Sequence, residues 1–533
     1  MTQRPEIGLG AWNIYFILKL VLFVQGTIEF HFLNNLAFIA FLFLPTTKHP
    51  FLGVAKQVIA IPVGLYLLHD DSFLPPISHA FAQVGNVASF SAGYLIELLE
   101  RSVSADFVKT LFVISVFYVM FNKILRVSVL VTGAMFYLQL SNSAIVLPTT
   151  QTLQQPITTA QNTANAVTTP INNLNEQLSK VKNDFFAQQA DLKLPFDKKL
   201  ESKSNFDVLV LSICSLAWED VKYFHQENHK LFKEFDILFE HFNSATSYSG
   251  PAVVRLLQAN CGQKQHDNLM TNPSNKNCYL VENLKNIGFD IELILNHDGA
   301  FDNFLTLIKD KGSLNVEPVK YQLHDYLRNF DDSHVYRDKE IFSQWITHRE
   351  SHPARKKFTF YNTISLHDGI HYEEDHSLKS SDTYEKRLIT LLDDMYDILD
   401  GLKKTNRPIV VLFVPEHGAN IKGDKVQMAG MRELPSPAIT NLPVGLKIIG
   451  NGIARMGEQQ IVKEPSSFFA IAHLVNQILE QDVFAQNQFA PEKLLNNLPQ
   501  TPMLSENEGS TVMQFDKNYY YSYGNGEWNN YDE

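Results

Sequence analysis

The contrast between an apolar N-terminal third and a polar remainder constrains the fold more than any other feature. The chain has 533 residues, more than one ordinary hydrophobic core requires, so we expect two or more independently organised regions. Residues up to about Leu147 are rich in Phe, Leu, Ile and Val, and most acidic residues behind the net charge of -12 follow them. No nucleic-acid partner is expected, because binding to a phosphate backbone requires clustered Lys and Arg.

Five apolar segments of this region qualify as membrane-spanning helices. A span takes about 20 residues, so their boundaries are soft. Buried helices of a soluble core are the alternative, but five such runs without amphipathic alternation favour spans. No small-residue cleavage site follows the first run, which predicts a retained anchor instead of a signal peptide. The predicted spans are Ala11 to Thr27, Phe30 to Leu44, Val54 to Leu68, Phe107 to Phe121 and Leu125 to Val146.

Basic residues beside these segments predict the orientation. Arg4, Lys48, Lys56, Lys123 and Arg126 fall on one side when five spans are counted. Because basic loops stay in the cytoplasm, the N-terminus is placed there and the large C-terminal region outside it.

Two other features of the N-terminal region leave alternatives open. Residues Ser78 to Glu100 are too polar to cross a membrane and predict either a helix on its outer surface or an ordinary soluble helix. Lys19 lies inside the first span and either contacts the interior of the helix bundle or extends to the interface. We assign Lys19 no function.

The cysteines fit an oxidising compartment. Cys261 and Cys278 flank a polar loop that a disulfide could close. Cys214 is left over, directly after a hydrophobic strand. It is either a buried structural cysteine or a metal ligand.

A polar stretch separates the apolar region from the rest. Residues 148–195 are rich in Thr, Gln, Asn and Ala, and cannot bury enough surface to offset their ordering entropy. We therefore expect a transmembrane domain at 1–147, a flexible polar linker at 148–195 with a helix near Asn172 to Leu192, and a soluble domain at 196–533.

The soluble domain alternates β-type runs with helical stretches, which predicts an α/β fold with a mostly parallel sheet sandwiched by helices. Its end predicts an antiparallel hairpin with Gly524 and Asn525 in the turn. The predicted strands are Phe206 to Ser215, Phe289 to Gly299, Lys357 to Gly369, Pro408 to Gly418 and Val444 to Gly450, and the predicted helices include Pro251 to Asn260, Ser380 to Lys403 and Ser466 to Glu480.

Three segments that close apolar strand-like runs carry reactive side chains: VLVLSICS with Cys214, NSATSYSGP with Ser249, and IVVLFVPEHG with Glu416 and His417. Ligands collect at the carboxyl ends of strands in open α/β sheets. Ser249 precedes a helix-like run, so it is either an N-cap serine or a nucleophile placed where helix N–H groups favour phosphate. The four side chains together match the ligands of tetrahedral zinc.

Further residues are candidates for proton transfer and phosphate binding. His367 in SLHDGIHY is the first candidate for proton transfer and His371 the second, although either is also explained as a loop histidine. Arg432 and Tyr248 are candidates for contacts with phosphate oxygens, which a guanidinium matches in bidentate fashion. His297 also follows a predicted strand and has no assigned role.

These strings resemble the alkaline phosphatase and sulfatase superfamily, and within it the membrane-anchored phosphoethanolamine transferases of the cellulose-modifying branch. The resemblance rests on ICSLAW, FNSATSYSGPA, CYL, FYNTISLHDGIHY, VPEHG and MRELPSPAIT, and extends over essentially the whole chain. It implies a multi-pass protein of the bacterial inner membrane with a periplasmic catalytic domain at 196–533.

The resemblance also implies the reaction. Phosphoethanolamine would pass from phosphatidylethanolamine to the 6-hydroxyl of glucose units in nascent cellulose. Cys214, Ser249, Glu416 and His417 would hold one zinc ion, and Ser249 would carry the covalent intermediate. His367 would assist proton transfer, and Arg432 and Tyr248 would hold the phosphoryl group.

The implied partners are the bacterial cellulose synthase and its small membrane accessory subunits. The wider transferase family usually has a Thr nucleophile, an Asp-His ligand pair and an acidic first ligand where Cys214 stands. Two other hypotheses remain. One is a membrane-tethered phosphodiesterase or sulfatase-type hydrolase, and the other a non-enzymatic scaffold of a polysaccharide secretion complex.

Overall fold

The computed structural model describes two compact units, one formed by 1–88 and 92–166 and the other by 89–91 and 167–533. Arg4, Lys48, Lys123 and residues 148–169 of the predicted linker lie outside the described residues. The described residues are 9–25, 28, 30–45, 50–72, 90–102, 105–122, 125–144, 170–203, 206–352, 356–375, 379–405, 407–524 and 527–531.

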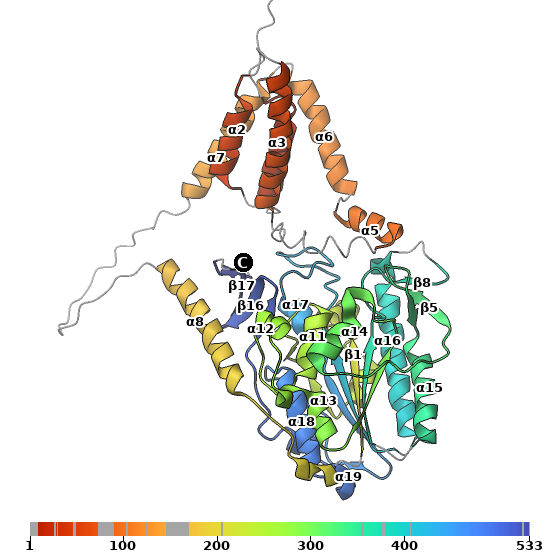
Figure 1. The fold of residues 1–533 in the computed structure, drawn as a ribbon. Helices are drawn as coiled ribbons and strands as arrows, with labels where there is room; N and C mark the ends of the chain where they lie inside the picture. The colour runs from red at the N-terminus through yellow and green to blue at the C-terminus, as the bar shows by residue number, and fades with distance from the viewer. Residues whose placement is uncertain are drawn as a thin grey trace, which may run out of the picture. The chain divides into compact units, whose positions relative to one another are not determined.

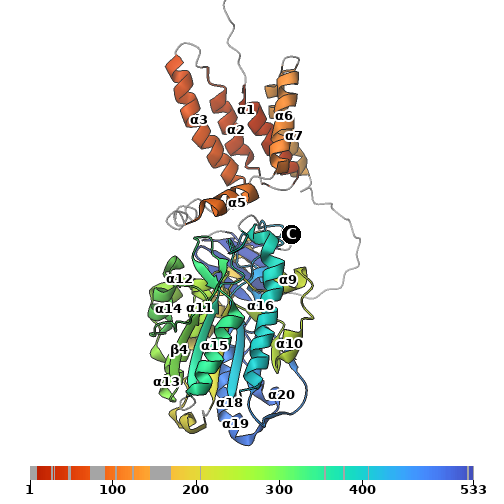
Figure 2. The same ribbon diagram turned by 90° about the vertical axis from the view of Figure 1, so that its right-hand side faces the viewer.

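Each of the five apolar segments forms a helix in the first unit (Figure 1). Helix α1 packs against α6 and α7, and α2 packs against α3. A further helix, α5, runs across the direction of these helices (Figure 2); residues 78–89 of the predicted surface helix lie outside the described residues. The bounds are α1 Trp12–Val24, α2 Phe32–Leu42, α3 Pro50–Asp70, α5 Ala92–Ser102, α6 Ala105–Phe121 and α7 Val127–Ala144.

The apolar helices differ in length. Of the residues that the structure describes, one helical stretch, Phe51–Asp70, has both the length and the apolar composition to cross a membrane. The apolar stretches of α1, α2, α6 and α7 are shorter. All five predicted segments are therefore helical, and one of them reaches the length of a span.

Lys19 joins three helices of this unit. Its Nζ lies 2.5 Å from Asp71 Oδ2, directly after α3, and 2.8 Å from Asn35 Oδ1 of α2. Asp71 also accepts hydrogen bonds from Asn35 Nδ2 and from the backbone N–H of His31. Lys19 and Asp71 are fully buried, so the lysine contacts the bundle interior, the first of the two alternatives that the sequence leaves open.

The second unit is built on a seven-stranded mixed sheet with the order β13-β2-β11-β9-β1-β7-β4. All neighbouring pairs are parallel except those of β11. After β9 the chain remains at the edge where that strand ends, so β11 re-enters from this edge and runs back. The strands are β1 Asp207–Ile213, β2 Ile237–Phe239, β4 Asp290–Leu295, β7 Lys357–Thr363, β9 Ile409–Pro415, β11 Gly445–Ile449 and β13 Gln460–Val462.

Helices cover both faces of this sheet, as the sequence predicts (Figures 1 and 2). In β1, Val208 and Val210 belong to one hydrophobic cluster and Leu209 and Leu211 to another, because successive side chains of a strand point to opposite faces. The first cluster is covered by α11 Ser249–Leu257, α13 Leu280–Asn286, α14 Phe304–Gly312 and α18 Phe468–Glu480, and the second by α15 Asp338–Ser351 and α16 Ser380–Lys403.

A four-stranded antiparallel sheet closes the chain: β15 Leu504–Asn507, β16 Ser510–Phe515, β17 Asn518–Tyr523 and β18 Asn529–Asn530. The predicted terminal hairpin, in the segment Thr511 to Glu533, covers β16, β17 and β18, and Gly524 directly follows β17. Strand β15 precedes that segment and was not predicted, and Asn525 lies outside the described residues. Helix α8, Pro170–Asp191, packs on this sheet through Leu178, Phe185 and Phe186. The helix predicted near Asn172 to Leu192 is confirmed, and it belongs to the second unit.

The remaining elements of the second unit are short. They are η1 Lys198–Lys203, α9 Trp218–Tyr223, α10 Lys230–Glu234, β3 Phe242–Asn243, α12 His266–Thr271, η2 Lys276–Cys278, η3 Phe301–Asn303, β5 Asp325–Arg328, β6 His334–Tyr336, β8 His371–Tyr372, α17 Pro437–Thr440, β10 Asn441–Leu442, β12 Ala454–Arg455, α19 Val483–Gln486, β14 Gln488–Phe489 and α20 Pro491–Leu494. Cys261 and Cys278 form the predicted disulfide, and Cys214 is a buried free thiol.

The buried ion pair of the first unit gives a test of its packing. Replacing Lys19 by Met removes the ammonium group from the buried Asp71 carboxylate and leaves the His31 ring, 2.8 Å away, beside it. We expect the free energy of unfolding in mild detergent to fall by about 3–5 kcal/mol. The double variant Lys19→Met with Asp71→Leu removes both charges and should recover most of this loss. Chemical unfolding followed by circular dichroism measures the free energy of unfolding of the single and the double variant. A single variant as stable as the wild type would contradict the role of the ion pair.

Candidate active site

The four predicted ligands meet at one edge of the large sheet. Strands β1 and β9 are parallel neighbours with Ile213 paired to Pro415, so Cys214 and Glu416 leave the sheet side by side. Backbone hydrogen bonds extend the pairing, from Glu416 N to Ile213 O at 2.8 Å and from Leu216 N to His417 O at 2.6 Å. Ser249 begins α11.

The side chains of these residues form a compact cluster. Ser249 Oγ lies 3.2 Å from Cys214 Sγ and 3.1 Å from His417 Nε2. Cys214 Sγ lies 3.7 Å from His417 Nε2, and one ligand atom from each of Cys214, Glu416 and His417 lies within 4.8 Å of the others. His417 Nδ1 donates to Gly418 O at 2.9 Å, which leaves Nε2 as the basic ring nitrogen.

The backbone after β1 is strained where it presents the thiol. Ser215 has a φ of 60°, a left-handed conformation that is uncommon for a residue other than glycine. Tyr384 donates a hydrogen bond of 2.6 Å to Ser215 O, which holds this turn. Strain of this kind gathers at functional sites because surrounding structure must maintain it.

Burial dominates the electrostatics of the cluster. Desolvation raises the pKa of the Cys214 thiol to about 11 and the pKa of Glu416 to about 7. The pKa of His417 is lowered well below its ordinary value by burial and by the nearby Arg432 charge. Each shift disfavours the charged form, because burial removes that form from water. The Arg432 guanidinium partly opposes this effect for Cys214, since it lowers the pKa of the thiol.

The donor set fits a divalent cation of borderline character such as zinc, which binds thiolate, imidazole and carboxylate. Glu416 Oε1 accepts from Ser212 Oγ at 2.7 Å and from Asn362 Nδ2. Glu416 Oε2 is buried and has no hydrogen-bond partner among the described residues. A buried orphaned carboxylate oxygen is costly, and a bound cation would satisfy it.

Arg432 and Tyr248 join the cluster. Arg432 Nη1 lies 3.2 Å from His417 Nδ1 and 3.4 Å from His417 Nε2. The guanidinium carbon of Arg432 lies 5.7 Å from the centre of the Tyr248 ring, a cation–π distance. Tyr248 is the residue that precedes α11, so both side chains adjoin Ser249.

His367 lies on the loop after β7. Burial, followed by the charge of Arg432, lowers the pKa of His367 to about 4, so its ring is neutral at physiological pH. Its Nδ1 donates to Asp368 O at 2.7 Å, which makes Nε2 the basic nitrogen. The buried Arg387 holds this loop by donating to Ser365 O at 2.7 Å.

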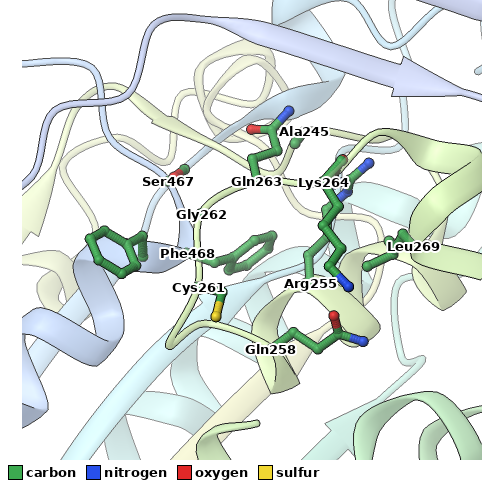
Figure 3. A pocket seen from close by; sticks show the side chains of 11 residues that line it. Ala245, Arg255, Gln258, Cys261, Gly262, Gln263, Lys264, Leu269, Ser467 and Phe468 are labelled. Atoms are coloured by element: carbon green, nitrogen blue, oxygen red, sulfur yellow. Dashed lines mark hydrogen bonds between the residues drawn. The ribbon is translucent and has the colours of Figure 1, made fainter. Parts of the chain in front are cut away.

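His371 and one small cavity are separate from the cluster. His371 is part of β8 and lies 3.8 Å from Asp332. A cavity of about 20 Å³ beside Arg255, Gln263 and Lys264 (Figure 3) is lined by Cys261 of the disulfide and by none of the predicted catalytic or metal-binding residues. It has room for about one water molecule, so it does not compete as a substrate site.

Sequence reasoning missed three polar residues that position the site. Ser212 and Asn362 are fully buried partners in the parallel pairing of β1 and β7. Asn507 of β15 donates to Ser247 Oγ at 2.6 Å and to Arg432 O at 3.0 Å. A polar residue inside an otherwise apolar strand is a usable signal for the first two, whereas Asn507 depends on a contact between distant segments.

Comparison with known proteins identifies what this chain is similar to. The model of the cellulose biosynthesis protein BcsG C-terminal domain matches residues 160–528, and that of the BcsG N-terminal domain matches 12–140. Cellulose biosynthesis protein BcsG of Salmonella typhimurium is 36% identical over 99% of this chain and 98% of its own length. The protein of the same name from Escherichia coli is 35% identical over 98% and 96%.

A solved structure was also found. A protein in the alkaline phosphatase superfamily from Vibrio parahaemolyticus aligns with 66% of this chain and 87% of its own, at 12% identity and a TM-score of 0.44. Because this structural similarity is low, the family of the chain is assigned from the family models and from the two full-length relatives.

The cluster makes a testable prediction about metal content. Replacing Cys214 or His417 by Ala removes one donor, and we expect zinc affinity to fall by more than about 100-fold, beyond the usual effect of an outer-shell change. His371→Ala is the matched control, since it removes an imidazole outside the cluster. Chelator competition and elemental analysis of the full-length protein measure the effect. Equal zinc content in His417→Ala and His371→Ala would contradict the assignment.

Proposed function

The chain belongs to the cellulose biosynthesis protein BcsG family, and from this premise we propose that it is a phosphoethanolamine transferase that modifies cellulose. The donor would be phosphatidylethanolamine and the acceptor the 6-hydroxyl of glucose units. One observation carries the proposal: Ser249 Oγ contacts both Cys214 Sγ and His417 Nε2 at the start of a helix. This arrangement suits a nucleophile better than a capping residue.

We propose that Cys214, Ser249, Glu416 and His417 would hold one zinc ion. When bound, the ion would lower the pKa of the serine hydroxyl and offset negative charge on the phosphoryl group. Other groups of the protein would bind the donor phosphate. The free N–H groups at the start of α11 favour the donor phosphate, and Arg432, supported by the Tyr248 ring, can bind two of its oxygens.

The transfer would proceed in two balanced steps. Ser249 Oγ forms a bond to the donor phosphorus, the bond from phosphorus to the glycerol oxygen breaks, and diacylglycerol leaves with the serine proton. The glucose 6-hydroxyl then attacks the phosphoethanolamine-serine, and the bond to Ser249 Oγ breaks. Nε2 of neutral His367 is suited to accept the hydroxyl proton in this second step.

We propose that the catalytic domain at 196–533 lies in the periplasm and is anchored in the inner membrane by five helices at 1–147, connected by a linker within 148–195. The disulfide between Cys261 and Cys278 supports an oxidising compartment. Most of the large apolar side chains that the described residues expose lie on helices of the first unit, among them Phe51, Phe112 and Val129, as expected for surfaces that face lipid. The cellulose synthase and its small membrane subunits are the proposed partners.

The covalent intermediate can be tested by intact-mass spectrometry of the full-length protein in detergent with phosphatidylethanolamine and zinc. We expect the wild type to gain the mass of one phosphoethanolamine group and Ser249→Ala to gain none, with transfer reduced more than about a thousandfold. Ser343→Ala, on an exposed part of α15, is the matched control. If Ser249→Ala transfers at the wild-type rate, the serine mechanism is wrong.

The same preparation distinguishes the proposed transferase from a hydrolase and from a scaffold. A labelled cello-oligosaccharide that gains phosphoethanolamine supports transfer. Free phosphoethanolamine without labelled acceptor supports the hydrolase, and no adduct in a zinc-loaded wild type supports the scaffold.

The lowered pKa of His367 gives a pH prediction for the second step. A base whose pKa lies near 4 remains unprotonated as the pH falls from about 7 to about 5, so the single-turnover rate should stay flat over this range. The rate should fall only as the pH approaches about 4, with zinc content measured in parallel. Loss of rate with a midpoint near the ordinary histidine value of about 6.5 contradicts the environment described for His367.

A further inference from the structure

Asn362 connects the Glu416 carboxylate to a residue outside the cluster. Its Nδ2 donates to Glu416 Oε1, and lies 3.3 Å from Ser212 Oγ. Its Oδ1 lies 2.9 Å from His297 Nε2. A carboxylate can only accept hydrogen bonds, so the amide nitrogen must face Glu416 and the amide oxygen must face His297.

The ring of His297 has a defined tautomer. The backbone N–H of Gly299 donates to His297 Nδ1 at 3.1 Å, so Nδ1 is the accepting nitrogen. Nε2 then carries the ring proton and donates it to Asn362 Oδ1. Burial lowers the pKa of His297, in agreement with a neutral ring.

These hydrogen bonds determine how Glu416 can bind a cation. Ser212 Oγ and Asn362 Nδ2 both bond to Oε1, while Oε2 is buried without a partner among the described residues. Oε1 is thus held by the protein, and Oε2 is the oxygen left for a ligand. Outer partners that orient a metal ligand typically change metal affinity by about 10- to 100-fold when they are removed.

We propose that His297 is a positioning residue of the active site: by donating to Asn362 it fixes the amide that holds Glu416 Oε1, so that Glu416 offers a single oxygen, Oε2, to the metal ion. This inference rests on the proposed metal site. His297 does not touch the ligands or the substrate in this arrangement, and acts only through Asn362.

A purely structural role must be separated from this one. His297 begins a turn through its bond to Gly299 N, and its ring lies 5.5 Å from the ring of Phe304. Two substitutions divide these contacts. His297→Asn keeps an acceptor near the Nδ1 position for Gly299 but withdraws the donor, and His297→Gln places an amide donor near the Nε2 position but loses the acceptor.

The test measures zinc affinity by chelator competition in the full-length protein, and the visible spectrum after cobalt loading, which reports ligand geometry. We expect His297→Asn to weaken zinc binding by about 10- to 100-fold and to alter the cobalt spectrum. His297→Gln should stay close to wild type in both. Thermal unfolding of the metal-free variants reports the structural contribution separately.

Three results would overturn the inference. Wild-type affinity and spectrum in His297→Asn would show that the donor to Asn362 is not needed. Weakening in His297→Gln equal to that in His297→Asn would assign the effect to the turn. A wild-type protein that binds neither zinc nor cobalt would remove the proposed metal site as well, so the two failures remain distinguishable.

Discussion

The parallel register of β7, β1 and β9 is the constraint on which the site depends. Ile213 pairs with both Thr363 and Pro415, so the three strands end at one level. Cys214 directly follows β1 and Glu416 directly follows β9, so the two residues lie side by side without any long loop. These strands are buried on both faces. If one strand slipped by one residue along its neighbour, each of its apolar side chains would move to the opposite face of the sheet. The packing of the core therefore fixes the strand register, and with it the positions of the site residues.

Two distant segments complete what the strands begin. Helix α11 supplies Ser249, and the loop before α17 supplies Arg432. Asn507 of the C-terminal sheet accepts from Thr246 Oγ1 at 2.9 Å and donates to Arg432 O and Glu433 O. The Asn507 amide thus joins the segment before Ser249 to the segment that carries Arg432. The small sheet therefore helps to position residues of the candidate site.

Sequence reasoning succeeded where function and fold share a local signal. Reactive residues directly after Val and Leu runs predicted Cys214, Glu416 and His417 at one sheet edge, and the α16 bounds, Ser380–Lys403, match the prediction. Sequence reasoning failed for strand pairings and hydrogen bonds that form between segments far apart in the chain. The antiparallel entry of β11, the β5, β6 and β8 sheet and the role of Asn507 depend on residues far apart in the chain, and no local pattern encodes them. The position of His297 after a predicted strand marks it as a candidate, but the local sequence does not indicate its partner, since Asn362 lies on another strand.

The buried polar groups explain how an unfavourable cluster is maintained. A thiol with a pKa of about 11 and a carboxyl with a pKa of about 7 would be charged only at a cost in free energy, which the sheet and its helices must offset. Hydrogen bonds from Ser212 and Asn362 stabilise one oxygen of Glu416, and the other has no hydrogen-bond partner in the part of the chain that the structure describes. A cation that binds here must therefore displace the proton of Cys214, which couples its affinity to pH. The packed core thus holds the side chains of Cys214, Glu416 and His417 close together, and a bound cation would supply the positive charge that stabilises their ionised forms.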